Sequence, residues 1–234
     1  MQERPPPDFD GVNKFIFSGS GEDFVETVED NRIYTGSNND EIVVGTNDRA
    51  FGGSGSDTLE GSIGRGSNRL YGGANNDEII VGTGDRAFGG NGNDIIDASV
   101  GSGNNRLYGN EGNDTFFLGA NDRVVGGDGD DRFFVVDGGN NTMTGGAGAD
   151  QFWIVDGSLP TLTEGVNIIT DFTSGVDVIG IGGNLGITPN DVVLTANGTD
   201  TLISISGVNL ARVIGVDSNT LSVTRLNPDA IAVV

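Results

Sequence analysis

The sequence contains no cysteine and no histidine. Disulfide bonds, thiol chemistry and zinc sites built from these side chains are therefore impossible. Catalysis by Ser-His-Asp or Cys-His groups is excluded as well. No apolar run approaches the ~20 residues of a membrane-spanning helix. The first residues, MQERPPPDFDG, lack the apolar segment of a cleaved signal peptide.

Basic residues are also scarce, since 12 Lys and Arg stand against 34 Asp and Glu and give a formal net charge of −22. Such a chain repels itself unless cations neutralise it, so we expect no nucleic-acid partner. Glycine, by contrast, accounts for 41 of the 234 residues, more than twice its usual share of ~7%. The glycines recur in phase with aspartates, which indicates a structural repeat and not a flexible linker.

A nine-residue phrase organises the chain, and residues 89–97, GGNGNDIID, show it best. Versions of the phrase return at intervals of 17, 17, 20, 17, 20, 17 and 19 residues. This regularity predicts a solenoid, whose coils bury their apolar side chains only by stacking on one another. The eight versions begin at Ser18, Thr35, Gly52, Gly72, Gly89, Gly109, Gly126 and Gly145.

A second, degenerate half-turn separates successive phrases. An arginine recurs in most of these half-turns, and the residue just before its position alternates strictly between asparagine and aspartate. The full pattern therefore repeats every two coils, a super-repeat of 37 residues, which is also the interval between the loop aspartates Asp40 and Asp77. The alternating positions are Asn31, Asp48, Asn68, Asp85, Asn105, Asp122 and Asn141.

Apolar residues predict two parallel sheets around a thin interior, because strand alternation points one residue of each short strand inward. On the glycine-rich side the inward residues are Val25, Ile42, Leu59, Ile79, Ile96, Phe116, Phe133 and Phe152. Facing them are Ile33, Ala50, Leu70, Ala87, Leu107, Val124 and Met143. The predicted fold class is therefore all-β, a parallel β-roll or β-solenoid.

Oxygen donors in the glycine-rich loops are suited to calcium, which takes six to eight hard oxygen ligands. Every loop has an aspartate at its sixth position: Asp23, Asp40, Asp57, Asp77, Asp94, Asp114, Asp131 and Asp150. Glycine permits the turns that direct backbone carbonyls inward, at Gly53, Gly55, Gly73, Gly90, Gly92, Gly112, Gly127, Gly129, Gly146 and Gly148. Stacked loops can share ions, so eight loops offer at most seven sites. On the degenerate edge only Asp48, Asp85 and Asp122 keep a carboxylate, and we expect fewer or weaker ions there.

These loops resemble the RTX, or hemolysin-type, calcium-binding nonapeptide repeats, with the pattern G-G-x-G-x-D-x-U-x. The resemblance covers about residues 18–157, and ITDFTSGVDVI is typical of the segment that follows such repeats. It implies a right-handed parallel β-roll, calcium held by the aspartates and loop carbonyls, and type I secretion through an uncleaved C-terminal signal. Departures are Ser18 and Thr35 at the first glycine, Asn110 at the second, and Asn38 and Asn75 at the third, where asparagine tolerates the left-handed conformation.

The domain organisation follows from this periodicity. We expect residues 1–17 to form a tail and an entry strand at Phe15 to Phe17, residues 18–157 the repeats, and residues 158–234 a β-rich cap that carries the secretion signal. Within the cap, Asn197-Gly198-Thr199-Asp200 predicts a hairpin turn. Asp171 and Asp177 are either a last calcium site or turn residues.

The functional expectation is a secreted, non-enzymatic calcium-binding module that serves as a structural or adhesive element, with a cell-surface or polysaccharide partner possible and no nucleic acid. The alternatives are the RTX portion of a secreted hydrolase-type enzyme and, less favoured, an ice-binding β-solenoid with Thr46 and Thr83.

Two outward columns complete the pattern. Arginines recur at Arg32, Arg49, Arg69, Arg86, Arg106 and Arg123, and rings two positions on at Tyr34, Phe51, Tyr71, Phe88 and Tyr108. We expect these ladders chiefly to stabilise the sheet, and a binding strip for an anionic or sugar polymer is the alternative. Phe117, Phe134 and Trp153 on the other sheet are expected to be buried under the cap.

Overall fold

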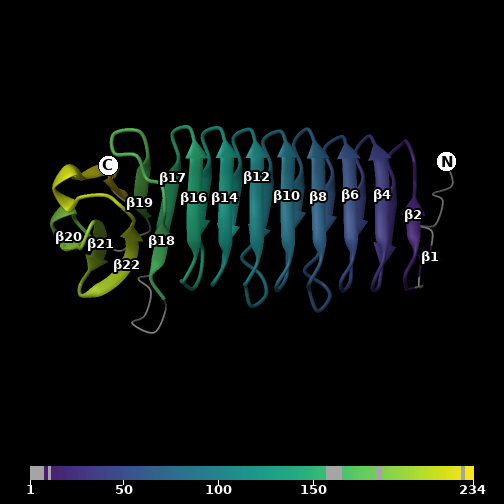
Figure 1. The fold of residues 1–234 in the computed structure, drawn as a ribbon, viewed down its shortest axis with the longest axis horizontal. Coiled ribbons are helices and arrows are strands. Elements are labelled where there is room, and N and C mark those ends of the chain that lie inside the picture. The colour runs from purple at the N-terminus through teal and green to yellow at the C-terminus, as the bar shows by residue number, and fades with distance from the viewer. Residues whose placement is uncertain (1–7, 10–11, 157–164, 183–185, 228–229) are drawn as a thin grey trace.

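A computed structural model describes residues 8–9, 12–156, 165–182, 186–227 and 230–234. Stacked coils form an elongated rod, with β2 near one end and the antiparallel strands of the cap at the other (Figure 1). Each coil contributes one strand to each of two sheets, which run the length of the rod. The predicted boundary between residues 157 and 158, and most of the predicted tail, lie outside the described residues.

The first sheet, sheet A, contains the short strands that follow the loop aspartates. Its order is β1-β3-β5-β7-β9-β11-β13-β15-β17-β19-β24-β23, parallel from β1 to β19. The strands are β1 (Asp8–Phe9), β3 (Phe24–Thr27), β5 (Glu41–Val43), β7 (Thr58–Glu60), β9 (Glu78–Ile80), β11 (Ile95–Ala98), β13 (Thr115–Leu118), β15 (Arg132–Val135), β17 (Gln151–Asp156), β19 (Val178–Gly182), β23 (Val223–Asn227) and β24 (Ala230–Val233).

The second sheet, sheet B, contains the longer strands that lead into the glycine-rich loops. Its order is β2-β4-β6-β8-β10-β12-β14-β16-β18-β22-β21-β20. The strands are β2 (Phe15–Phe17), β4 (Arg32–Ser37), β6 (Arg49–Ser54), β8 (Arg69–Ala74), β10 (Arg86–Asn91), β12 (Arg106–Glu111), β14 (Arg123–Asp128), β16 (Thr142–Ala147), β18 (Asn167–Ile169), β20 (Val192–Asn197), β21 (Asp200–Ile205) and β22 (Val208–Val213). The entry strand at Phe15–Phe17 is confirmed, because β2 pairs in parallel with β4.

The core lies between the two sheets, where the predicted inward residues meet. All fifteen of them are at most 1% exposed, which confirms the predicted alternation. A second apolar residue after six of the eight loop aspartates also enters the core, as Val44, Val81 and Leu118 do. Toward the cap the core residues become rings, and Phe133 stacks between Phe116 and Phe152 with centroids 5.0 and 4.8 Å apart.

The outward rings of sheet A are not buried, contrary to the expectation. Phe117, Phe134 and Trp153 are each half-buried. They stack on one another, with centroid distances of 5.4 and 6.3 Å. At the cap end of this row, Gly180 in β19 lies against the Trp153 indole.

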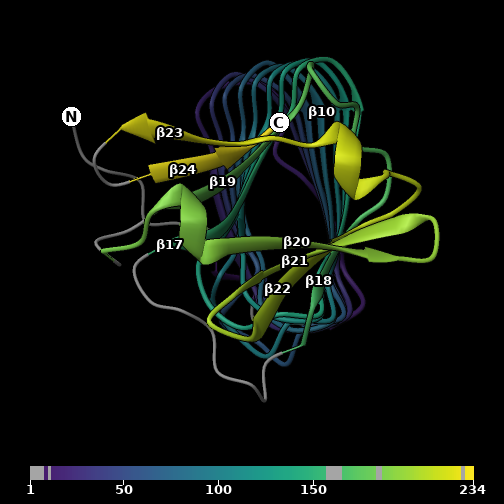
Figure 2. The ribbon, with the colours of Figure 1, turned by 90° about the vertical axis from the view of Figure 1, so that its left-hand side faces the viewer.

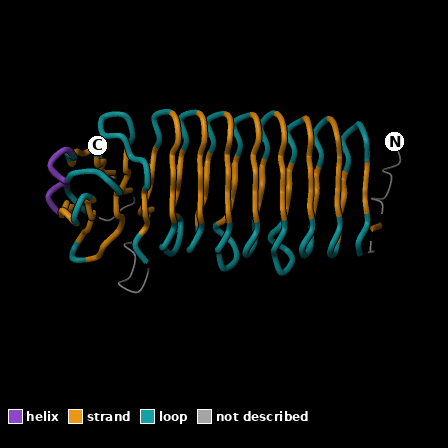
Figure 3. Tube along the Cα trace, viewed as in Figure 1, coloured by secondary structure: helices purple, strands orange, loops and turns teal. Residues whose placement is uncertain are grey.

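The cap closes the rod by extending both sheets with antiparallel strands. β18 continues sheet B, and β22, β21 and β20 follow it, while β24 and β23 extend sheet A beyond β19. Viewed along the rod, these strands lie across the end of the coils (Figure 2). The side view shows strands alternating with loops in the coils (Figure 3). Two short 3-10 helices, Pro189–Asp191 and Ser218–Thr220, complete the cap. In the described part of the chain, no helix has the length and apolar character needed to cross a membrane.

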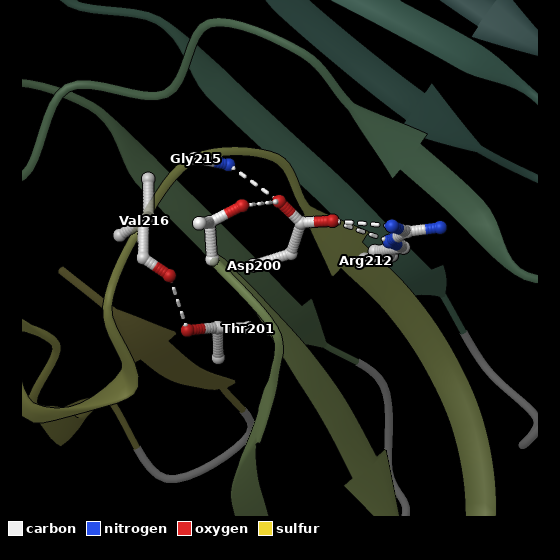
Figure 4. A network of polar contacts seen from close by, with 6 residues as sticks. Asp200, Thr201, Arg212, Gly215 and Val216 are labelled. Carbon is white, nitrogen blue, oxygen red and sulfur yellow. Dashed lines mark hydrogen bonds and ion pairs between the residues drawn. The ribbon is translucent and has the colours of Figure 1, made fainter.

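The predicted hairpin forms between β20 and β21, with Asn197 paired to Asp200. Asp200 ties this turn to the neighbouring segment (Figure 4): its Oδ1 accepts the Gly215 N–H at 2.8 Å, and its Oδ2 pairs with Arg212. These bonds lower the pKa of Asp200, the Gly215 N–H being the largest cause. The cap is thus held by its own polar contacts as well as by apolar packing.

Candidate metal centre

The loop aspartates form one continuous row along the glycine-rich edge, here called the loop ladder. From Asp40 to Asp150 each of these side chains is at most 3% exposed. The Oδ1 atom of each accepts the backbone N–H of the aspartate one coil earlier, at 2.8–2.9 Å. For example, Asp77 donates its N–H to Asp94 at 2.8 Å. Each coil therefore places the carboxylate of the next.

The second oxygen of these carboxylates lacks a hydrogen-bond partner. Among the described residues, a buried Oδ2 without a partner occurs in seven successive loops, at Asp23, Asp40, Asp57, Asp77, Asp94, Asp114 and Asp131. A buried charge without compensation is costly, and a row of such oxygens needs protons or metal cations.

The pKa values of these groups are raised for the same reason. Burial raises the pKa of Asp77, Asp114 and Asp131 to about 7, and that of Asp94 and Asp150 to about 6. The backbone N–H that each carboxylate accepts offsets only part of this effect. Burial raises the pKa of the loop aspartates Asp40 and Asp57 as well. The ladder is therefore electrostatically unfavourable at neutral pH until a cation neutralises it.

The loop glycines hold the backbone in a conformation that other residues resist. Gly90 has φ of +126°, and a Cβ there would lie 2.0 Å from the Gly73 carbonyl oxygen. The ten predicted loop glycines share this property, with φ between +111° and +142°. The asparagines that replace loop glycines also take positive φ, 76° at Asn38, 79° at Asn75 and 83° at Asn110. Asparagine is the residue expected there, because it tolerates this region.

The first glycine of four phrases, at Gly52, Gly89, Gly109 and Gly126, marks where a carboxylate and a carbonyl approach each other. A Cβ at Gly89 would lie 2.1 Å from Asp94 Oδ2 and 2.9 Å from the Gly109 carbonyl oxygen. Within the described residues, no three acidic side chains converge on one point. A site would therefore combine a carboxylate with backbone carbonyls, a hard-oxygen set that suits calcium. The residues present fit calcium, because they offer unpartnered anionic oxygen beside carbonyl oxygen.

The degenerate edge carries a second row, here called the Asx ladder. Again each side-chain Oδ1 accepts the backbone N–H of the equivalent residue one coil earlier, at 2.6–2.9 Å from Asp48 to Asn141. Asn167, which sequence reasoning missed, continues the row into β18 by accepting the Asn141 N–H at 3.2 Å. Asn167 stands two residues before an inward apolar residue, Ile169, as the other asparagines of the ladder do before theirs. That spacing could have identified it from the sequence.

The alternation of this ladder has a hydrogen-bonding reason. Asp48 Oδ2 accepts the Gly45 N–H at 2.9 Å, and Asp85 Oδ2 accepts the Gly82 N–H at 2.8 Å. Asn105 does the reverse and donates its Nδ2 to the Gly82 carbonyl at 3.1 Å. Asp48 and Asp85 thus satisfy loop donors, and Asn105 satisfies a loop acceptor.

On this edge, most carboxylate oxygens therefore accept hydrogen bonds from protein groups. Of its three predicted ligand carboxylates, only Asp122 has an Oδ2 without a partner in the described structure. Burial raises the pKa of Asp48 and Asp85, and that of Asp122 to about 6. This arrangement supports the expectation that the degenerate edge holds fewer or weaker ions than the loop ladder.

Two aspartates of the cap, Asp171 and Asp177, were predicted to be either a last calcium site or turn residues. Both serve as hydrogen-bond acceptors. Asp177 extends the loop ladder, since its Oδ1 accepts the Asp150 N–H at 3.0 Å and its Oδ2 accepts the Thr173 N–H at 2.7 Å. Asp171 binds the last glycine-rich loop through the N–H groups of Gly145 and Gly146, both at 2.9 Å. Their oxygens are engaged by backbone donors, which favours the turn interpretation over a last calcium site.

The threonines considered for ice binding are also engaged. Thr46 Oγ1 accepts the Arg65 N–H at 2.9 Å, and Thr83 Oγ1 accepts the Ser102 N–H at 2.8 Å. Both bonds anchor the longer loops of the degenerate edge. These hydroxyls therefore do not form a free threonine array.

Fold and loop ladder together define a β-solenoid with a row of unpartnered carboxylate oxygens, a candidate series of hard-oxygen metal sites. Comparison with known families identifies its class, because the model of the RTX calcium-binding nonapeptide repeat (4 copies) matches residues 51–86, 84–102, 88–122, 119–138 and 133–153. This part of the chain consists of RTX repeats, a calcium-binding structural module.

Comparisons with whole proteins are less informative. No curated protein matches the chain. Among solved structures, the extracellular lipase LipA from Serratia marcescens matches over 84% of this chain and 39% of the lipase chain, with 21% identity and a TM-score of 0.25. The chain thus spans well under half of that structure's length.

Proposed function

We propose that this protein is a secreted structural module that folds when calcium binds along its loop ladder. The observation that carries the proposal is the row of seven buried Oδ2 atoms without a partner, from Asp23 to Asp131. The carboxylates of the loop ladder and the loop carbonyls would hold the ions. Calcium, when bound, supplies the positive charge that the buried carboxylates lack.

The same row supports a proposed number of seven ions. Eight loops offer seven positions between neighbours, and seven carboxylates leave an oxygen without a partner. Seven calcium ions would change the formal charge from −22 to −8, calculated from the sequence composition. Because one oxygen of each carboxylate already accepts a backbone N–H, Oδ2 is the atom available to the metal.

Calcium should couple to folding because each coil has only a thin core. A few inward side chains per coil do not offset the ordering entropy of its backbone, and metal binding energy then becomes folding energy. Outside the cell calcium is plentiful, so the proposal includes secretion by a type I system. A structural or adhesive role is the use that a rigid rod supports.

Far-UV circular dichroism with and without calcium tests this function. Calcium-depleted protein at neutral pH should be largely unfolded, and calcium should restore the β-sheet spectrum with cooperative dependence on concentration. Isothermal titration calorimetry should give a stoichiometry near seven. A β-rich spectrum that persists in excess chelator at neutral pH would contradict calcium-coupled folding.

A further inference from the structure

Six arginines lie in register on the outer face of sheet B and are called the arginine column. Each is the first residue of its strand, and each is the direct register partner of the next. Adjacent members are therefore separated by about 4.8 Å, the spacing between strands. The column consists of Arg32, Arg49, Arg69, Arg86, Arg106 and Arg123, the first and last two exposed and the others half-buried.

No carboxylate of the described structure forms an ion pair with an arginine of this column. In the cap, by contrast, Arg212 pairs with Asp200 (Figure 4). The aspartates that precede the arginines, Asp48, Asp85 and Asp122, point inward, where they are 0% exposed and accept backbone N–H groups. These aspartates, although adjacent in sequence, therefore lie on the opposite face of the sheet from the arginine column.

Like charges directly opposite each other on neighbouring strands destabilise a sheet. Here six positive groups stand in line on a protein whose formal charge is −22. An external polyanion would supply the compensation that the described part of the chain does not provide. The guanidinium is suited to this, since its planar fork donates two parallel hydrogen bonds to one carboxylate.

A column of stacked rings runs beside the arginine column on the same face, two residues further along each strand. Centroid distances between successive rings are 4.5–5.0 Å, and interplanar angles are 2–8°. Ring faces are therefore covered by neighbouring rings, and edges remain for a ligand. The rings are Phe17, Tyr34, Phe51, Tyr71, Phe88 and Tyr108.

This stacking decides which polymer fits. Single-stranded nucleic acids bind by laying bases on free aromatic faces, and faces within this column are not free. Sugar rings that stack on aromatic faces are disfavoured for the same reason. Ring edges carry the positive end of the aromatic quadrupole, so they favour anionic groups, as the guanidiniums do.

We infer that the arginine column and the ring edges beside it form a binding strip for a linear polysaccharide that carries carboxylates. The chain would lie along the rod axis, across β4 to β14, with its carboxylates on successive or alternate guanidiniums. The strip exists only when the coils are stacked. The expectation that binding requires calcium therefore rests on the proposed calcium-dependent folding.

Hyaluronan oligosaccharide is the probe, with dextran of equal length as the neutral polymer and oligothymidylate as the nucleic acid. Binding is measured by calorimetry at fixed free calcium and again in chelator, with circular dichroism recorded for each sample. Hyaluronan should bind in calcium, with an affinity that falls as salt rises, and dextran should not. Equal binding of dextran, or tighter binding of oligothymidylate, would overturn the inference.

Arg86→Gln should weaken hyaluronan binding about tenfold, the loss expected for one charge-assisted pair. Arg132→Gln is the matched control, because this substitution removes the same charge outside the strip. Arg132 is exposed and lies on β15 in sheet A. Arg86→Lys should give an intermediate loss, since the ammonium keeps the charge but not the fork. If Arg86→Gln lowers thermal stability in calcium and leaves binding unchanged, the column is structural and the inference fails.

The two proposals fail in distinguishable ways. A protein that stays folded and binds hyaluronan in chelator would refute calcium-coupled folding while supporting the strip. A protein that folds with calcium but does not bind hyaluronan would refute the strip alone. Loss of binding in Arg86→Gln with an unchanged calcium-dependent spectrum would support both.

Discussion

Replacing Asp94 by asparagine should affect the calcium-free and calcium-loaded proteins in opposite directions. Asparagine keeps an Oδ1 to accept the Asp77 N–H, now bonded at 2.8 Å. It removes the charge and converts the unpartnered Oδ2 into a donor on the side of the Gly109 carbonyl. The Asx ladder already contains this arrangement, in which Asn105 donates to the Gly82 carbonyl at 3.1 Å.

The magnitude follows from the pKa of the carboxyl. Burial raises the pKa of Asp94 from 3.8 to about 6. A raised pKa means that the folded state binds the proton more tightly, so stability falls as pH rises from about 4 to about 6, and the full penalty applies above that range. At pH 7.5 that penalty is about 3 kcal/mol, and Asp94→Asn should return most of it to the calcium-free fold. With calcium, the same variant loses an anionic ligand and should need more calcium to fold.

The calcium-free comparison uses trimethylamine oxide, which favours compact states, and follows the midpoint of refolding in chelator by circular dichroism. Asp94→Asn should lower that midpoint and raise the calcium midpoint. Asp85→Asn is the matched control, because its amide would place a donor against the Gly82 N–H that Asp85 now accepts at 2.8 Å. That variant should destabilise both states. Equal destabilisation of the calcium-free fold by the two variants would refute the assignment of an unsatisfied charge to the loop ladder.

Three further outcomes are expected. Asp94→Ala should raise the calcium midpoint and lower cooperativity more than Asp23→Ala, because Asp23 ends the row; equal effects in calcium titrations would argue against ligands shared between loops. Since burial raises the pKa of Asp114 to about 7, calcium-depleted protein should gain stability as pH falls from 7 toward 4 and lose it as pH rises through 7. Circular dichroism should then show more β-structure at pH 5 than at pH 8, and a spectrum independent of pH would contradict this. Phe133→Ala should cost about 3–5 kcal/mol in urea unfolding with calcium, and Phe134→Ala, a half-buried ring on the outer face, should cost clearly less; similar losses would contradict the core assignment.

The repeat region was largely predictable, and nearest-neighbour stacking is the reason. When one coil packs on the next in fixed register, the period of the sequence states which residues meet. The inward residues from Val25 to Phe152, the entry strand at Phe15–Phe17 and the positive φ of Asn38 and Asn75 all followed from the phase of the repeat.

The cap was less predictable because it has no period. Its hairpin between β20 and β21 was readable from turn chemistry. The strand β24 and the extension of both sheets were not, since these pairings join segments far apart in sequence. The half-buried state of Phe117 and Phe134 on the outer face of sheet A was likewise not readable from the alternation of the strands.

The sequence by itself determined the solenoid, its two faces and the residue types of the metal row, because each depends on local alternation and on a fixed repeat length. Only the tertiary structure decided how each carboxylate divides its oxygens. Stacking directs Oδ1 to a backbone N–H of the adjacent coil and leaves Oδ2 without a partner in the loop ladder. On the opposite edge, the same stacking gives Asp85 a second donor. Identical aspartates thus differ because the loops around them present different backbone groups, which no residue type specifies.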